Sequence, residues 1–106
     1  MARALINVPA KAAKGQIVEI KTMLSHPMET GFRPDNQGKL IARDIINRFE
    51  CLFEGEPVFA ADLHPAISAN PFFTFTMAAT NSGELTFRWK GDSGEITEEK
   101  RKFVVE

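Results

Sequence analysis

The chain of 106 residues has little cysteine, no tyrosine and no strong excess of charge of either sign. A single cysteine, Cys51, cannot form an internal disulfide, so the fold depends on packing alone, and cysteine usage by itself indicates a reducing compartment. Thirteen Lys and Arg against fourteen Asp and Glu leave a net charge of −1. Because no basic block is present to hold a phosphate backbone, we expect no nucleic-acid partner.

Long apolar runs are also missing. No run approaches the roughly 20 residues of a membrane-spanning helix, so we expect no membrane partner. The apolar segment at residues 4–8 is interrupted by Asn7 and is shorter than the ~7–15 residues of a signal-peptide core. The sequence therefore predicts no signal peptide in this chain.

Nucleotide and zinc motifs are absent as well. The sequence contains no glycine-rich nucleotide loop, no cysteine pair and no His-Glu-x-x-His pattern, and we expect no cofactor. With 43% apolar and 25% charged residues the composition is that of an ordinary globular protein. The length predicts a single domain over residues 1–106.

Most of the chain alternates apolar and polar residues at a period of two, which predicts strands with one buried face. The strands are expected at residues 4–8, 16–24, 45–54, 57–61, 72–79, 84–90 and 95–105. The core is expected to contain Val18, Ile20, Phe49, Phe53, Phe75, Phe87 and Trp89. About seven antiparallel strands at this spacing are typical of an immunoglobulin-like β-sandwich, which is the all-β fold class that we predict.

Turn residues suggest how two pairs of strands are joined. Residues 80–83 predict a hairpin between the strands at 72–79 and 84–90, and residues 91–94 predict the next turn. The charged first half of the last strand predicts a protected sheet edge. A helix over residues 39–49 competes with the strand at 45–54, because Ile41, Ile45 and Phe49 recur at four-residue steps.

Residues 25–44 form the longest connection and are the first place to look for recognition, because loops of this length in small domains are often functional. Their charges are of both signs, and could form a solvated face or a complementary rim for a protein partner. The residues predicted to contact a partner are His26, Met28, Glu29, Arg33, Asp35 and Arg43.

An enzyme is the main alternative, with His26 paired with Glu29 as a general base, or with Cys51 as a nucleophile. Two-residue steps place Cys51 between Phe49 and Phe53, so we expect its thiol to be buried and inert. The sequence therefore favours a structural cysteine.

A blue-copper site is a further alternative, because such a site takes two His, one Cys and a weak axial Met. The residues of those types are His26, His64, Cys51 and Met77, but they are spread over separate segments. We expect a core thiol, a core thioether and two polar loop histidines instead.

Several short motifs follow one another along the chain: residues 26–31 (HPMETG), 38–41 (GKLI), 45–47 (IIN), 53–59 (FEGEPVF), 68–71 (SANP) and the segment 83–92. In their order and spacing they resemble the SoxZ family, the smaller subunit of the SoxYZ sulfur-carrier complex of bacterial thiosulfate oxidation. The resemblance covers nearly the whole chain. It implies an immunoglobulin-like, non-catalytic subunit that pairs with SoxY, whose C-terminal cysteine carries the sulfur intermediates.

The resemblance also implies transient contact with other Sox enzymes, and a periplasmic location reached by export with a signal-bearing partner. The C-terminal residues 102–106 agree with a supporting role, because they contain neither cysteine nor glycine. In isolation the chain could pair with a second copy through the vacant partner surface, and a self-associating adhesion-like module is a third alternative.

Overall fold

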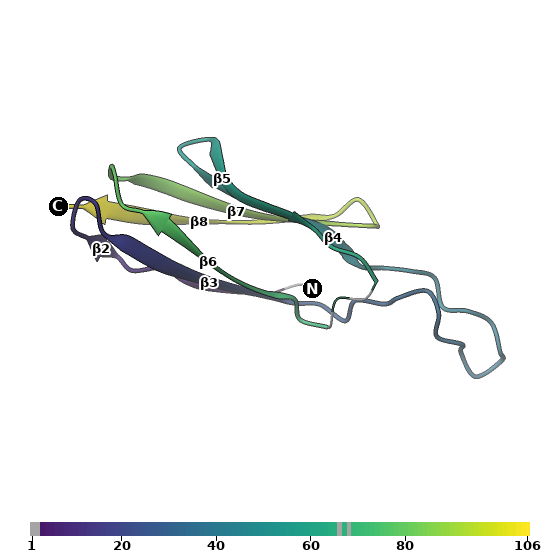
Figure 1. Cartoon of the computed structure of the whole chain (residues 1–106). Coiled ribbons are helices and arrows are strands. Elements are labelled where there is room, and N and C mark those ends of the chain that lie inside the picture. Colours follow the sequence, from purple (N-terminus) through teal and green to yellow (C-terminus); the bar gives the residue numbers. More distant parts are fainter. Residues whose placement is uncertain (1–2, 66, 68) are drawn as a thin grey trace.

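A computed structural model describes residues 3–65, 67 and 69–106 as two facing β-sheets (Figure 1). The smaller sheet has the strand order β1-β3-β6 and the larger sheet the order β2-β8-β7-β4-β5. The strands are β1 (Arg3–Asn7), β2 (Lys11–Ala12), β3 (Ile17–Ser25), β4 (Ile46–Phe53), β5 (Glu56–Asp62), β6 (Phe72–Ala78), β7 (Gly83–Gly91) and β8 (Ile96–Val105). The predicted all-β sandwich is confirmed, and each predicted strand lies within one residue of its observed ends.

The core lies between the sheets, where the alternation along each strand places it. In β3, Val18 and Ile20 are buried while their neighbours are exposed, and β7 buries Phe87 and Trp89 in the same way. Aromatic rings from both layers meet there: Phe49 stacks on Phe73 at 4.8 Å between ring centroids. The predicted core residues are all buried except Phe53, which is partly buried against the same cluster.

The predicted hairpin across residues 80–83 is wrong. Strand β6 pairs with β3 and β7 pairs with β4 and β8, so the chain crosses from one sheet to the other here. Ala79 is fully buried, and its backbone exchanges hydrogen bonds with the β3 side, from Ala79 N–H to Gln16 O at 2.8 Å and from Gly15 N–H to Ala79 O at 2.7 Å. These contacts keep the end of β6 on the smaller sheet. The hairpin was predicted because the same turn-forming residues occur in hairpins and in connections between two sheets.

The second predicted turn is correct, since β7 and β8 are antiparallel neighbours on either side of residues 92–95. The first half of β8 has no strand on its outer side among the described residues, which confirms the predicted charged edge. At its other end β8 pairs in parallel with β2, a two-residue strand too short to show an alternating pattern. Within the part of the chain that the structure describes, the sandwich therefore has eight strands and one parallel pair.

The competing helix over residues 39–49 does not form. Ile46 is fully buried although it is out of phase with the buried Phe49 and Cys51, because the pairing of β4 with β7 shifts register between Ile46 and Arg48. The extra residue of a bulge changes which positions of a strand face the core. Ile45, which precedes the strand, is fully buried as well. None of the described residues forms a helix of the length and apolar character that a membrane crossing requires.

Candidate functional site

Residues 26–45, here called the projecting loop, connect β3 to β4 and extend beyond the end of the sandwich (Figure 1). The loop is not irregular throughout, because its two limbs are joined by isolated bridges between Glu29 and Asp44 and between Pro34 and Leu40. Glu29 and Asp44 exchange two backbone hydrogen bonds of 3.0 and 2.8 Å. The projecting loop is therefore a narrow structure with its own internal pairing.

His26 fixes the base of the first limb. Its side chain is only 6% exposed, and its Nδ1 accepts the Met28 N–H at 3.0 Å. The His26 backbone N–H donates to Asn70 Oδ1 at 2.9 Å, and the Asn70 N–H donates to the His26 carbonyl at 2.8 Å. His26 thus joins the projecting loop to the segment that precedes β6.

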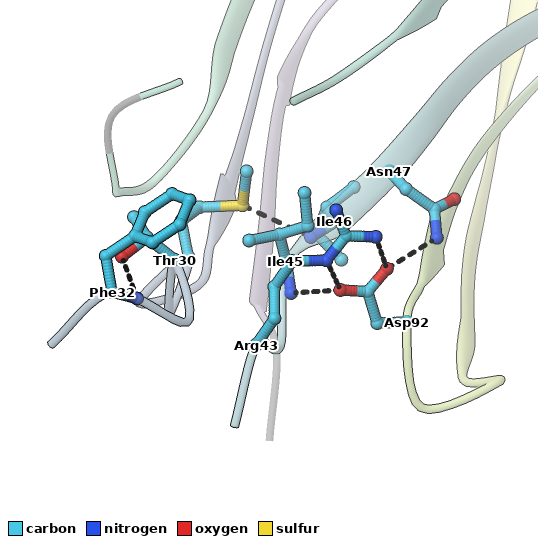
Figure 2. A network of polar contacts seen from close by, with 8 residues as sticks. Thr30, Phe32, Arg43, Ile45, Ile46, Asn47 and Asp92 are labelled. Carbon is cyan, nitrogen blue, oxygen red and sulfur yellow. Dashed lines mark hydrogen bonds and ion pairs between the residues drawn. The ribbon is translucent and has the colours of Figure 1, made fainter. Parts of the chain in front are cut away.

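Met28 is buried beside His26 and has a positive φ of 53°. Its sulfur accepts the Ile46 N–H at 3.2 Å, so it satisfies the backbone donor at the first residue of β4 (Figure 2). His26 and Met28 were predicted to contact a partner. Since both are buried, their direct contribution in this structure is to shape the loop.

Asp92, in the turn between β7 and β8, holds the second limb (Figure 2). It accepts hydrogen bonds from Arg43 Nε at 2.8 Å and Nη2 at 3.0 Å, from the Ile45 N–H at 3.2 Å and from Asn47 Nδ2 at 3.0 Å. Burial would raise the pKa of Asp92, but the hydrogen bonds from Asn47, Arg43 and Ile45 outweigh it and lower that pKa. Asn47, the polar residue that interrupts the apolar face of β4, therefore serves as a hydrogen-bond donor to Asp92.

Charged residues nearer the tip are also paired within the loop. The Arg33 guanidinium donates to the Glu29 carboxylate, which holds the pKa of Glu29 below its usual range. Asp35 Oδ1 accepts the Gln37 and Lys39 N–H groups at 2.8 and 3.0 Å, which forms the turn at the tip. The predicted contact residues Glu29, Arg33 and Asp35 therefore have structural partners of their own.

The projecting loop also leaves two large apolar side chains in solvent. Phe32 is 76% exposed, the largest exposed fraction among the large hydrophobic residues described, and Leu40 is 65% exposed. Sequence reasoning missed both because it selected mainly charged residues, together with His26 and Met28. The available signal was a phenylalanine and a leucine within a stretch otherwise rich in Gly, Pro and charge.

A polar grouping at the loop base brings together three residues of metal-ligating types. Ligand atoms of His26, Asp44 and Glu95 lie within 4.8 Å of one another, and His26 Nε2 is 3.5 Å from Glu95 Oε1. Because Nδ1 accepts the Met28 N–H, the neutral ring carries its proton on Nε2, where a metal would need a lone pair. The grouping therefore fits a buried imidazole facing a carboxylate better than a metal centre.

The proposed catalytic pairs are not assembled. Glu29 is bonded to Arg33 and His26 to Met28, so the two do not form a general-base pair. Cys51 is fully buried within β4, and burial raises the pKa of its thiol to about 12. A thiol with this pKa supplies almost no thiolate near neutral pH, so it is not an activated nucleophile.

Two facing sheets with a braced loop at one end define an immunoglobulin-like all-β sandwich, and solved structures share this fold. A superoxide reductase (neelaredoxin) from Ignicoccus hospitalis is 22% identical with a TM-score of 0.77, covering 97% of this chain and 80% of that one. The sulfur carrier protein SoxY from Chlorobium limicola is 15% identical with a TM-score of 0.70, covering 97% and 78%.

Residues 6–102 match the family model described as sulphur oxidation protein SoxZ, and the chain belongs to the SoxZ family. This confirms the resemblance drawn from the sequence motifs, of which Ser68 lies outside the described residues. Family membership implies a role in the Sox sulfur-oxidation system. No curated protein was found to match the chain.

Proposed function

We propose that this chain is the non-catalytic subunit of a SoxYZ carrier complex in thiosulfate oxidation, and that it binds SoxY. Membership of the SoxZ family over residues 6–102 is the observation that carries the proposal. In this assignment SoxY bears the covalent sulfur intermediates on its C-terminal cysteine, and this chain helps to present them to Sox enzymes, which it contacts transiently.

The state of Cys51 supports a carrier function that resides in the partner. Sulfur transfer to cysteine requires an accessible thiolate, and Cys51 has neither exposure nor a lowered pKa. A cation or imidazole beside the sulfur would favour the thiolate, but the directly opposite residues in the neighbouring strands are Phe59 and Phe87. The thiol of this chain therefore serves packing.

The projecting loop supplies a suitable surface for a protein partner. Exposed aromatic and aliphatic side chains are the usual anchors of interfaces, and they bind best when the backbone that carries them is already ordered. Phe32 and Leu40 meet both conditions, since the two bridges and the Glu29–Arg33 ion pair brace the loop. Arg43 contributes through its contact with Asp92 at the base.

We further propose a periplasmic location, which the chain would reach by export together with a signal-bearing SoxY. The isolated chain could then pair with itself until its partner is present. A fractionation experiment with the signal of SoxY deleted checks this part separately, since both chains should then stay in the cytoplasm.

Co-purification followed by intact-mass analysis tests the main proposal. This chain and SoxY are mixed, exposed to thiosulfate together with the oxidising Sox enzymes, and each polypeptide is weighed. Sulfur adducts are expected on SoxY alone, and a Cys51→Ser variant of this chain should leave that result unchanged. A sulfur adduct on Cys51, or no complex with SoxY, would contradict the proposal.

A further inference from the structure

Strand β6 forms one edge of the smaller sheet. It pairs with β3 on one side, and within residues 3–65, 67 and 69–106 no strand pairs with its other side. An edge of this kind presents a row of backbone N–H and C=O groups that can pair with another strand.

The backbone contacts beside β6 identify the groups on the free side. Ala79 directs both its N–H and its C=O toward the β3 side, and the carbonyl of Pro71 accepts the Leu24 N–H there at 3.1 Å. Because backbone groups alternate in direction along an antiparallel strand, the odd-numbered residues of β6 face β3. The residues that face outward are Phe72, Thr74, Thr76 and Ala78.

Charge distinguishes β6 from the other sheet edges. Natural edge strands are protected by charged residues or proline. Strand β1 begins with Arg3, β5 contains Pro57 and ends at Asp62, and β8 contains the charged run at residues 98–102. Strand β6 has the sequence FFTFTMA, without charge or proline. Of these edges, β6 alone lacks such protection.

An apolar groove lies on the outer face beside the start of β6. The pairing registers place Leu5 opposite Met23 and Met23 opposite Phe72, so one apolar row crosses all three strands. Leu5 and Phe72 are largely exposed, and all three residues line the groove. Met23 is three residues before the projecting loop begins, so the groove lies at the loop end of the sheet.

We propose that the free edge of β6 pairs with an edge strand of SoxY, and that the groove receives an apolar side chain of that strand. This rests on the proposed function, because it adds a second contact surface for SoxY at the same end of the sandwich as the projecting loop. A SoxY of known structure has the same sandwich fold at a TM-score of 0.70, and a sandwich has edge strands to offer. Main-chain pairing would join the sheets of the two subunits into one.

Proline substitution tests the edge without removing a bond inside the chain. Thr74→Pro and Thr76→Pro each delete an outward N–H while the β3 ladder stays intact. We expect each variant to lower SoxY affinity by about tenfold or more in titration calorimetry. Thr74→Val and Thr76→Val are the matched controls, because they keep the N–H and the branched shape, and they should bind as the parent does.

Hydrogen exchange gives a readout that does not depend on how the variants fold. In the parent chain alone, the amides of Phe72, Thr74, Thr76 and Ala78 should exchange fast, and in the SoxY complex they should become protected. Amides of β8, such as that of Lys100, serve as the internal control and should not change.

The outcomes separate this inference from the proposed function. If the parent binds SoxY but the β6 amides stay unprotected and the proline variants bind equally well, the edge assignment is wrong while SoxY binding stands. A parent chain that does not bind SoxY refutes both. A homodimer through β6 that SoxY cannot displace would also overturn the assignment.

Discussion

The carboxylate of Asp92 accepts two hydrogen bonds from the guanidinium of Arg43, a residue 49 positions earlier in the sequence. This contact joins the turn between β7 and β8 to the second limb of the projecting loop. The same carboxylate also accepts the Ile45 N–H and a hydrogen bond from Asn47. The orientation of the loop relative to the sandwich therefore depends strongly on one acidic side chain.

Replacing Asp92 should lower the free energy of unfolding. Asp92→Ala leaves the Ile45 N–H and the Asn47 amide without their acceptor, and we expect a loss of about 2 kcal/mol in the free energy of unfolding. Asp62→Ala is the control, because it breaks an ion pair with Arg48 at a more exposed site, where about 0–1 kcal/mol is expected. Urea unfolding of the three proteins measures both values, and equal losses would contradict the role given to Asp92.

The lowered pKa of Asp92 predicts how this contribution depends on pH. Its folded-state pKa lies below the ordinary value of 3.8, so the stabilisation is complete at pH values well above 3.8 and is lost as the pH falls through the lowered value. The difference in unfolding free energy between the parent and Asp92→Ala should therefore be constant near neutral pH and shrink in acid. A difference that grows below pH 4 would refute the assignment.

Gly31 is predicted to be necessary for the close approach of the two loop limbs. It has a φ of +89°, and a Cβ built there would lie 3.1 Å from Arg43 Cβ. Gly31→Ala should destabilise the chain by about 1–2 kcal/mol and disturb the loop. Gly38→Ala is a matched control with a φ of +82° but no neighbour within 4 Å, so it reports backbone strain alone. Similar thermal shifts for the two variants would exclude the steric part of the argument.

Cys51 should resist alkylation in the folded protein. With a pKa of about 12, roughly one thiol in 10⁴ is ionised at pH 8, and the side chain is fully buried. Iodoacetamide at pH 8 should therefore leave the native chain unmodified for hours while it labels the urea-unfolded chain at once. Rapid labelling of the native chain, followed by mass spectrometry, would show that the thiol is accessible after all.

Phe32 is expected to anchor the partner. Phe32→Ala should weaken SoxY binding by about tenfold or more with no loss of thermal stability, because the ring contributes to an interface and is largely exposed in the chain itself. Ile96→Ala removes a similarly exposed apolar side chain from β8 and should bind normally. Charge reversal of Arg33 or Arg43 is a poorer test, since it also breaks internal ion pairs with Glu29 and Asp92.

The strands could be predicted from the sequence because one-sided burial imposes a period of two, as in β3 and β7. The change of sheet after β6 could not, since Thr80 to Gly83 has the same turn-forming residues in a hairpin and in a corner. Strand β2 has no pattern to detect because it is two residues long.

The candidate site was located correctly as a long connection, but the roles of its residues depend on contacts distant in sequence. The His26 backbone is hydrogen-bonded to Asn70, and the guanidinium of Arg43 is paired with the Asp92 carboxylate. Local sequence shows only the type of such residues and not their partners. For this reason the sequence predicted surface positions for the polar residues and did not indicate that Phe32 is exposed.

The Pro34–Leu40 bridge divides the projecting loop into a fixed stem and a short tip, residues 35–39, whose backbone closes through the Asp35 side chain. Nothing in the sandwich depends on the length of that tip. Insertions or deletions there can change how far the loop extends without disturbing the stem or the core. A change of length confined to residues 35–39 would therefore alter the reach of the loop and leave the contacts of its stem unchanged.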